Sequence, residues 1–244
     1  MTRIFFETTV REKTTIELAG ERAHYLSTVL RFGPGSKLII TDGSGSSYLA
    51  CIISLSKKRA VLDIQEKCAP APESPIDIML MQGLLKGEKM DIVVQKASEL
   101  GVKQIFPVIT ERSQIRETRK LQRWQKIAEE ASRQCGRALI TKILEPRDFA
   151  SAVQVFDQSN TARIILWEHA EMPFSSSLEA CTGKKQVTLF TGPEGGFSEK
   201  EVSTAAEKGF AIARMGKRIL RAETAAIAAV SVTQFVLGDL SGRL

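Results

Sequence analysis

The carboxy-terminal half of the chain is organised around the sequence Val187-Thr188-Leu189-Phe190-Thr191-Gly192-Pro193-Glu194-Gly195-Gly196-Phe197. Its first four residues form a short, mainly apolar run, which is typical of a buried strand, and a glycine-rich turn follows them. Ser198 and Glu201 then match a capping box, in which the serine caps a new helix and the glutamate reaches back to the serine amide. The predicted order is therefore strand, glycine loop, helix.

A second strand-to-helix turn follows in the same half of the chain. The predicted strand ends at Gly216, and an alanine-rich helix begins near Glu223. Lys217, Arg218 and Arg221 crowd the turn between them, although a helix amino terminus is already electropositive. These cations would repel one another unless an anion or a polar substrate lay nearby. The two turns together predict a single ligand site.

The glycine loop lacks the features of a phosphate-binding loop. No Lys-Ser or Lys-Thr pair follows its glycines, and it does not match GxGxxG. Glu194 in its middle would repel a pyrophosphate, so a neutral or cationic ligand fits better. Backbone groups exposed by the glycines could hold a purine edge and a ribose at the carboxyl ends of the strands. Taken alone, the loop is equally compatible with a plain strand-to-helix turn.

From Ile76 onward, strands and helices alternate, which predicts an α/β domain with a largely parallel sheet. Gly101 is the expected C-cap of its first helix, and Pro107 indicates a sheet edge or a strand end. The predicted strands are 76–81, 104–109, 162–167, 187–190 and 209–215, and the predicted helices are 90–100, 118–136, 148–156, 175–181, 198–208 and 223–237.

The first 68 residues predict a small, mostly β unit. A helix is expected at Glu21–Leu30, and strands at 37–41, 47–54 and 59–66 are joined by tight turns. Such spacing favours a small barrel or curled sheet. Residues 69–75 contain three prolines, which favours a stiff connector and places a domain boundary there. The expected domains are residues 1–70 and 76–244.

Composition excludes several classes of protein. The chain has 244 residues, 43% of them hydrophobic and 25% charged, which is ordinary for a soluble globular protein. Neither a signal peptide nor an apolar run of about 20 residues is found, so the expected compartment is the cytoplasm. Four scattered cysteines and two histidines argue against a zinc site and against a disulfide framework.

The net charge of +6 is concentrated in one region. Residues 101–142 contain ten Lys or Arg and four acids, an excess equal to that of the whole chain. On the predicted helix 118–136, an apolar stripe through Trp124 and Ala128 lies opposite a basic face that includes Arg119, Arg123 and Arg133. A solvated helix face is the plain alternative, but few acidic residues lie at neutralising positions. An RNA or DNA phosphate backbone is therefore the expected partner.

Five motifs follow one another along the chain. They are Lys86–Asp91 with Gln95–Val102, Pro107 with Glu111–Ser113, Gln134–Arg137, Gly192–Ser198 and Gly216–Ala225. Together they resemble the ribosomal RNA small subunit methyltransferase E family, which belongs to the SPOUT class. The resemblance spans nearly the whole chain and includes an amino-terminal unit similar to the family's PUA-like RNA-binding barrel.

The resemblance implies a SPOUT-type knotted parallel-sheet methyltransferase domain, preceded by a small PUA-like β-barrel domain and working as a homodimer. It implies methyl transfer from S-adenosylmethionine to N3 of a uridine in 16S ribosomal RNA, either free or in an assembled small subunit, without a metal or a membrane. The expected cofactor contacts are Leu166, Trp167, Glu168, Thr191, Gly192, Pro193, Glu194, Gly195, Gly196, Met215, Gly216, Ile219, Leu220, Thr224 and Ala225. The expected RNA contacts are Lys86, Lys89, Arg112, Arg116, Arg119, Arg123, Arg133 and Arg137.

The implied reaction sets requirements for two side chains. Uridine N3 must lose a proton, and the negative charge that results spreads to O2 and O4, where an arginine can stabilise it. Arg221 is the expected stabiliser, and Glu223 is a candidate base or orienting group. Two other functions stay open: ribose 2′-O methylation by the same class, and a non-catalytic RNA-binding or ribosome-assembly factor.

Overall fold

The computed structural model describes residues 2–6, 14–43, 45–69, 71, 73–154 and 161–242. The chain divides into two compact units. Unit 1 contains Met1–Glu73 with Ser132–Ile140, and unit 2 contains Ser74–Ala131 with Thr141–Leu244. Pro70 and Pro72 of the predicted connector lie outside the described residues, as do positions 155–156 of a predicted helix.

Unit 1 contains a five-stranded sheet in the order β1-β3-β4-β5-β2. Its strands are β1 (Arg3–Phe5), β2 (Thr15–Ala19), β3 (Lys37–Thr41), β4 (Ser47–Leu55) and β5 (Arg59–Lys67). All neighbouring pairs are antiparallel except β1 with β3. Two register shifts between β4 and β5 are irregularities of the kind that bends strands and curls a sheet. The predicted curled sheet is therefore confirmed, although β1 and β2 were not predicted.

The predicted helix at 21–30 is split in two. An α-helical turn, α1 (Glu21–His24), continues as a π-helix, η1 (Tyr25–Val29), in which the Leu30 amide donates to the Tyr25 carbonyl at 3.0 Å. Ala23 and Leu26 are fully buried in the apolar core of unit 1. The apolar pattern therefore located the segment correctly without distinguishing its two helical forms.

Unit 2 is built on a parallel sheet in the order β12-β10-β11-β6-β7-β8, and β9 also pairs with β7. Its strands are β6 (Asp77–Gly83), β7 (Gln104–Ile109), β8 (Lys142–Ile143), β9 (Arg147–Asp148), β10 (Thr161–Leu166), β11 (Gln186–Thr191) and β12 (Ala211–Ala213). Every pairing in this sheet is parallel, which confirms the predicted α/β architecture.

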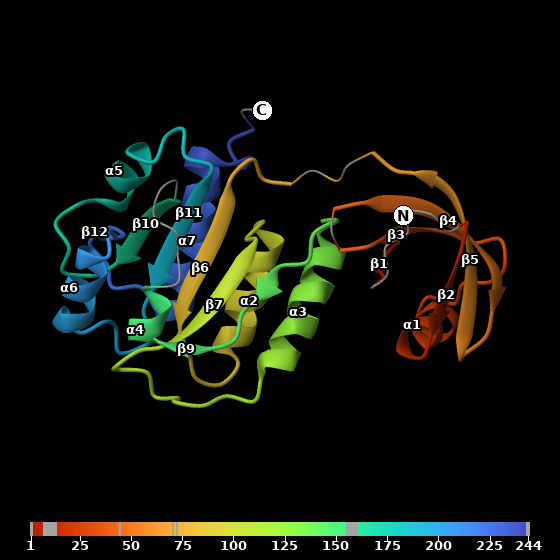
Figure 1. The fold of residues 1–244 in the computed structure, drawn as a ribbon, viewed down its shortest axis with the longest axis horizontal. Helices are drawn as coiled ribbons and strands as arrows, with labels where there is room; N and C mark the ends of the chain where they lie inside the picture. Colours follow the sequence, from red (N-terminus) through yellow and green to blue (C-terminus); the bar gives the residue numbers. More distant parts are fainter. Residues whose placement is uncertain are drawn as a thin grey trace. The chain divides into compact units, whose positions relative to one another are not determined.

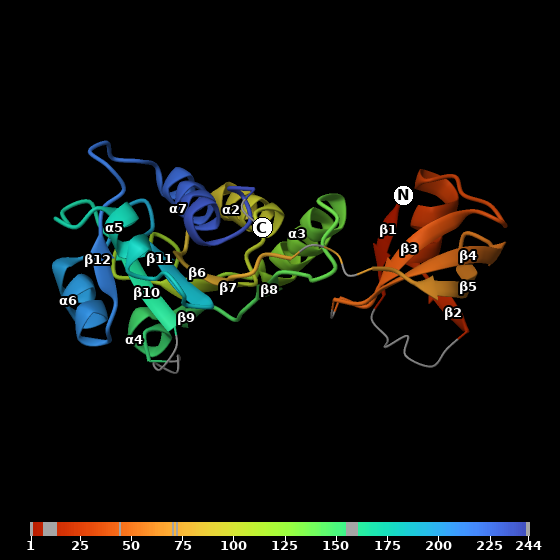
Figure 2. The same ribbon diagram turned by 90° about the horizontal axis from the view of Figure 1, so that it is seen from above.

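Helices cover both faces of this sheet (Figures 1 and 2). They are α2 (Lys89–Glu99), α3 (Leu121–Gln134), α4 (Phe149–Ala152), α5 (Phe174–Glu179), α6 (Glu199–Glu207) and α7 (Ala222–Leu237). Figure 2 shows α2 and α7 on one side of the sheet and α4 and α6 on the other. Successive side chains of β6 point to opposite faces of the sheet. Leu80 packs in the core that contains residues of α2 and α7, and Met81 packs in the core that contains residues of α6.

Pro107 does not mark a sheet edge. Strand β7 lies inside the sheet, with β6 on one side and the short strands β8 and β9 on the other. On that second side, β8 pairs with Gln104 and Ile105, and β9 pairs with Val108 and Ile109. Pro107 falls between the two short partners, where no ladder bond requires its missing N–H.

No helix in the described part of the chain is both long enough and apolar enough to span a bilayer.

Candidate functional site

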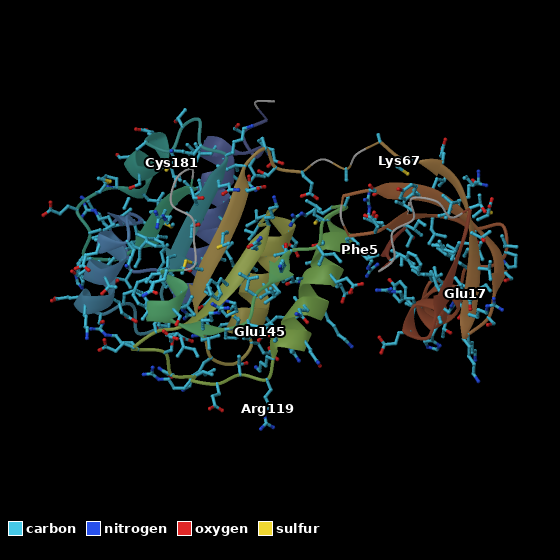
Figure 3. All side chains as sticks on the ribbon, in the orientation of Figure 1. Phe5, Glu17, Lys67, Arg119, Glu145 and Cys181 are labelled. Carbon is cyan, nitrogen blue, oxygen red and sulfur yellow. The ribbon has the colours of Figure 1, made fainter. Side chains whose placement is uncertain are left out.

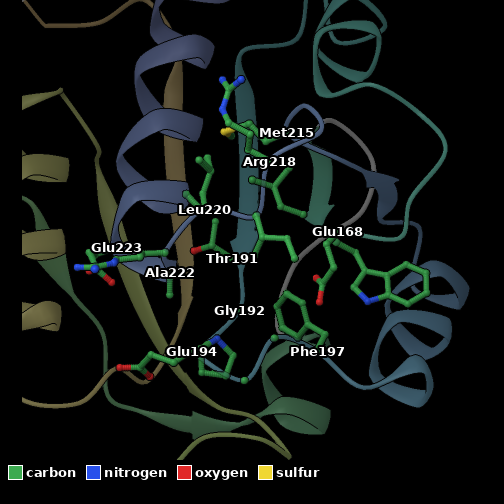
Figure 4. A pocket seen from close by; sticks show the side chains of 18 of the residues that line it. Glu168, Thr191, Gly192, Glu194, Phe197, Met215, Arg218, Leu220, Ala222 and Glu223 are labelled. Carbon is green, nitrogen blue, oxygen red and sulfur yellow. The ribbon is translucent and has the colours of Figure 1, made fainter.

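A cavity of about 510 Å³ opens at the carboxyl ends of β10, β11 and β12, which is the edge where open α/β sheets bind ligands (Figure 4). Three chain segments form its wall, and Lys89 and Ala225 complete it. The segments are Leu166–Glu168, Thr191–Phe197 and Met215–Glu223. The two predicted turns therefore belong to one cavity, of a size typical for small-ligand pockets (roughly 300–1,000 Å³).

The glycine loop leaves β11 at Thr191 and enters α6 at Ser198. A turn closes it, in which the Gly196 amide donates to the Pro193 carbonyl at 2.9 Å and Gly196 has a φ of 69°. The Ser198 amide then donates to Glu201 Oε2 at 3.0 Å, and the Glu201 amide donates to Ser198 Oγ at 3.4 Å. The predicted capping box is confirmed.

Glu194 brings a fixed negative charge to the cavity wall. Its Oε1 accepts from the Lys86 amide at 3.1 Å and from Lys89 Nζ at 3.0 Å. Burial disfavours the charged carboxylate, but hydrogen bonds from its own amide, from Lys89 and from the Lys86 amide outweigh burial and lower the pKa of Glu194. The carboxylate is therefore ionised at neutral pH and forms an ion pair with Lys89, which also lines the cavity.

The second turn brings a cation to the same cavity. Arg221 is the N-cap residue of α7, and its carbonyl accepts from the Ala225 amide at 2.8 Å. The residue is exposed and lines the cavity, and its guanidinium has neither a hydrogen bond nor an ion pair to any described residue. Arg221 is thus free to act on a bound molecule.

Two carboxylate oxygens of the cavity wall are buried without a partner among the described residues. One is Oε2 of Glu194, and the other is Oε2 of Glu223 in the first turn of α7. Buried polar atoms in native proteins almost always have a hydrogen-bond partner, so these two oxygens are exceptions among the described residues. Leu166, Trp167 and Phe197 give the same cavity apolar wall area.

Fourteen of the fifteen predicted cofactor contacts line this cavity, and so do Arg221 and Glu223. The exception is Thr224, which is exposed in the first turn of α7 and does not line the cavity. The other lining residues are Lys89, which was predicted as an RNA contact, and Phe197, Lys217, Arg218 and Ala222, which were not among the predicted contacts. Phe197 and Ala222 directly adjoin predicted residues, whereas Lys89 reaches the cavity through a contact spanning 105 positions.

The predicted RNA contacts fall into three groups. Lys86 and Arg119 are exposed, and the Arg119 side chain extends away from the ribbon (Figure 3). Arg112 and Arg116 are also exposed, but they donate to backbone carbonyls, Arg112 to that of Gly195 at 3.2 Å and Arg116 to those of Thr110 and Glu111. The remaining four residues have side-chain partners within their own unit.

The best-defined of these partners is Asp91, a carboxylate of α2 that is only 8% exposed. It accepts from Arg123 Nε at 2.9 Å and from Trp124 Nε1 at 3.0 Å, so it ties α3 to α2. The basic face of α3 therefore has an acidic partner that lies far away in sequence. Local spacing along the helix could not reveal it.

The other partnered cations are Lys89, Arg133 and Arg137. Lys89 pairs with Glu194, as described above. Arg133 donates to Tyr25 Oη at 3.0 Å and lies 5.1 Å from the centre of that ring. Arg137 is 6% exposed and pairs with Glu73 at 3.0 Å. Arg137 is thus a buried structural cation of unit 1 rather than part of an exposed basic face, because Glu73 neutralises it there.

Among the described residues, no three His, Cys, Asp or Glu side chains gather as they would around a metal ion.

Two family models match the chain. One is described as an RNA methyltransferase domain and matches residues 72–234, and the other is described as an RNA methyltransferase PUA domain and matches residues 18–65. The second match ends before the predicted connector of residues 69–75, the first begins inside it, and together they cover most of the chain.

The chain is similar over nearly its whole length to a curated relative and to two solved structures. A Buchnera aphidicola protein named ribosomal RNA small subunit methyltransferase E is 34% identical over 242 residues, which are 97% of this chain and 94% of the relative. A Neisseria gonorrhoeae protein of the same name, solved bound to S-adenosylmethionine, is 32% identical, with a TM-score of 0.91 over 98% of this chain and 99% of its own. A putative methyltransferase of Legionella pneumophila, also solved with this cofactor, is 33% identical, with a TM-score of 0.89 over 98% of this chain and 100% of its own.

Proposed function

The chain belongs to the ribosomal RNA small subunit methyltransferase E family, and we propose that it transfers a methyl group from S-adenosylmethionine to N3 of a uridine in 16S ribosomal RNA. The observation that carries the proposal is the single cavity that combines the glycine loop with Arg221 and Glu223. A ligand site and groups suited to an acceptor base are thus found at one edge of the sheet.

The cavity offers this cofactor both carboxylates and apolar side chains. Its acidic residues Glu168, Glu194 and Glu223 suit a molecule that carries a sulfonium and an ammonium group, and its apolar side chains suit a purine ring. When bound, the cofactor supplies an electrophilic methyl group. Glu194 has a lowered pKa, so its role here is to remain charged rather than to accept a proton.

Arg221 and Glu223 are proposed to act on the uridine. N3 gives up its proton before or during its attack on the methyl carbon, and the resulting negative charge spreads to O2 and O4 until the bond from N3 to carbon has replaced the bond from carbon to sulfur. The Arg221 guanidinium, which has no partner among the described residues, stabilises that charge. The Glu223 carboxylate accepts the proton or orients the N3–H group, since Glu223 lines the same cavity.

The decisive experiment is mass spectrometry of nucleosides from 16S ribosomal RNA and from small subunits incubated with the protein and S-adenosylmethionine. N3-methyluridine is the expected product. A ribose-methylated nucleoside would assign the protein to the 2′-O reaction instead. Cofactor binding by calorimetry is measured in parallel, and RNA binding without any cofactor affinity would identify a non-catalytic factor.

The proposed RNA contacts are the exposed cations Lys86, Arg112, Arg116 and Arg119, together with Arg123, whose side chain is 58% exposed beside Asp91. The PUA-type unit is proposed to bind the same RNA. Each cation that neutralises a phosphate releases counterions, which makes binding sensitive to salt. The Arg119→Glu variant is therefore expected to weaken RNA binding and to reduce the slope of log affinity against log salt by about one.

Charge reversal at Lys200 is the matched control for Arg119. Lys200 is an exposed cation in the first turn of α6, on the opposite side of the sheet from α2 and α7 (Figure 2). Lys200→Glu makes the same change in net charge and is expected to leave the salt slope near that of the wild type. Equal slopes for both variants and the wild type would show that Arg119 belongs to a solvated surface.

The homodimer is also a proposal, and α7 supports it. This helix carries one charged side chain, Glu223, and a helix that is apolar on all sides is normally buried on all sides. Phe235 and Val236 are nevertheless 61% and 42% exposed in the single chain. A second copy of the chain is the proposed cover. The cytoplasm is the proposed compartment.

The trefoil knot is proposed from the family resemblance. Its support here is that the connections after β11 and β12 line one cavity, as expected for a carboxy-terminal segment that returns past an earlier loop. Pulling the denatured chain by its two ends tests the knot. A knotted chain has a shorter extended length than an unknotted chain of 244 residues.

A further inference from the structure

Gln82 is a polar side chain in the interior of unit 2. It is the next-to-last residue of β6, is fully buried, and does not line the cavity. Burying an amide costs free energy unless its donors and acceptor find partners. The donors and the acceptor of the Gln82 amide all have partners. Two of the three partners lie at the start of the glycine loop, on Thr191 and Gly192.

The Gln82 amide holds the start of the loop at two points. Its Nε2 donates to the Gly192 carbonyl at 3.0 Å and to the Gly83 carbonyl at 2.9 Å. Its Oε1 accepts from Thr191 Oγ1 at 2.6 Å. Thr191 is itself buried and lies directly opposite Gln82 in the parallel pairing of β6 with β11. The side chain thus fixes both the last residue of the strand and the first peptide of the loop.

Two further contacts connect the same part of the chain to the loop. A Cβ atom on Gly83 would lie 2.5 Å from Pro193 N and 2.9 Å from the Gly192 carbonyl carbon, so the loop lies directly on the strand backbone. Glu194 is then held by the Lys86 amide and by Lys89 Nζ. Residues 82–89 therefore support the glycine loop from Thr191 to Glu194, and only Lys89 among them lines the cavity.

We propose that Gln82 is a positioning residue for the cofactor: its amide sets the orientation of the Thr191–Gly192 peptide segment and thereby the affinity for S-adenosylmethionine. The inference rests on the proposed function. Without the amide, the Thr191 hydroxyl and the Gly192 carbonyl would be buried without their partner, and the loop would move to find new ones. Positioning of this kind lowers the cost of ordering a loop when a ligand binds.

The Gln82→Leu variant tests the proposal by calorimetry with S-adenosylmethionine and by steady-state kinetics. The cofactor dissociation constant and KM are expected to rise by about tenfold or more, because two buried groups of the loop lose their partner. Turnover at saturating cofactor is expected to change much less, since Arg221 and Glu223 belong to another turn. An unchanged dissociation constant overturns the proposal.

The Gln234→Leu variant is the matched control. Gln234 is also a fully buried glutamine in unit 2, with its Oε1 accepting from Ser74 Oγ at 2.7 Å and its Nε2 donating to the Leu100 carbonyl at 2.7 Å. It does not line the cavity. Its loss is expected to lower the melting temperature as Gln82→Leu does, without weakening cofactor binding. Equal effects of both variants on the dissociation constant would mean that Gln82 serves only stability.

The Gln82→Glu variant keeps the test decisive if the leucine variant does not fold. A carboxylate at this position would face the carbonyls of Gly83 and Gly192, and burial would raise its pKa. Protonation restores one donor, so the variant is expected to regain cofactor affinity as the pH falls, relative to the wild type. A pH profile parallel to that of the wild type would refute the positioning role. If the wild type itself does not bind the cofactor, the proposed function has failed rather than this inference.

Discussion

Arg221 is a single residue whose removal should affect methyl transfer much more than cofactor binding. It is the N-cap residue of α7 and lines the cavity, while its guanidinium has no partner among the described residues. The Arg221→Ala variant should therefore keep S-adenosylmethionine affinity within a few-fold and lose about 10²–10³-fold in kcat, the usual loss on removing one oxyanion donor. Calorimetry and single-turnover assays measure the two quantities separately. Normal turnover in the variant would remove Arg221 from the reaction.

Glu194 gives a pH-dependent contribution to stability. Its folded-state pKa is lowered from the ordinary value of 4.5, so the folded form favours the ionised carboxylate. The contribution is complete above the pKa of the unfolded chain and is lost as the pH falls through the folded-state pKa. Near neutral pH, the wild type should therefore be more stable than Glu194→Gln, and the difference should disappear in acid. Urea denaturation of the cofactor-free proteins across this range measures it, and a difference independent of pH would contradict it.

Asp91 connects two helices at the scale of secondary structure elements. The carboxylate is buried, and so is its partner Trp124, whereas the Arg123 side chain is 58% exposed. Asp91→Ala should cost about 2–3 kcal/mol, because the Trp124 N–H loses its acceptor in the interior. Arg123→Ala should cost no more than about 1 kcal/mol, as expected for an exposed ion pair. Urea denaturation compares the two, and equal costs would mean that the ion pair dominates the contact.

The elements that the sequence predicted well have local signals. The capping box at Ser198 and Glu201 spans a single helical turn, and β7 has its predicted bounds of Gln104–Ile109. The two-residue strands β8 and β9 were missed, because two residues are too few to show a periodic pattern. These two strands also explain why Pro107 was misassigned to an edge: the interruption in the neighbouring strand is not visible in the sequence of β7.

In the candidate site, too, the sequence predicted the contiguous motifs and missed the contacts between residues that are far apart in the chain. The glycine loop and the basic turn could be recognised because their residues are contiguous, and the family resemblance joined them. The supports of the loop could not be recognised in this way, since Gln82 and Thr191 are 109 positions apart and Lys86 and Glu194 are 108 apart. The predicted strand ended at residue 81, so Gln82 was not recognised as a buried residue of β6, which ends at Gly83.

At the scale of the whole molecule, α7 should govern association. Phe235→Asp places a charge on the exposed apolar face of this helix, where it would be desolvated in a dimer but hydrated in a monomer. The variant is expected to sediment as a monomer at concentrations where the wild type is a dimer. Ile53→Asp is the control, because Ile53 is 52% exposed in unit 1 and lies outside α7. A wild-type monomer, or a dimer that survives Phe235→Asp, would exclude this helix as the interface.

The order of the strands delays completion of the parallel sheet during synthesis, because β6 must wait for its second neighbour. Strand β6 pairs with β7 soon after both are made, but its other neighbour, β11, begins about 100 residues after β6 ends. At about 5–20 residues per second, one edge of this apolar strand waits on the order of 5–20 s for its partner. An unpaired strand edge recruits other chains. A nascent chain that stalls before Gln186 is therefore prone to aggregate. A chaperone that prevents this must act during the time the ribosome takes to synthesise the residues between β6 and β11.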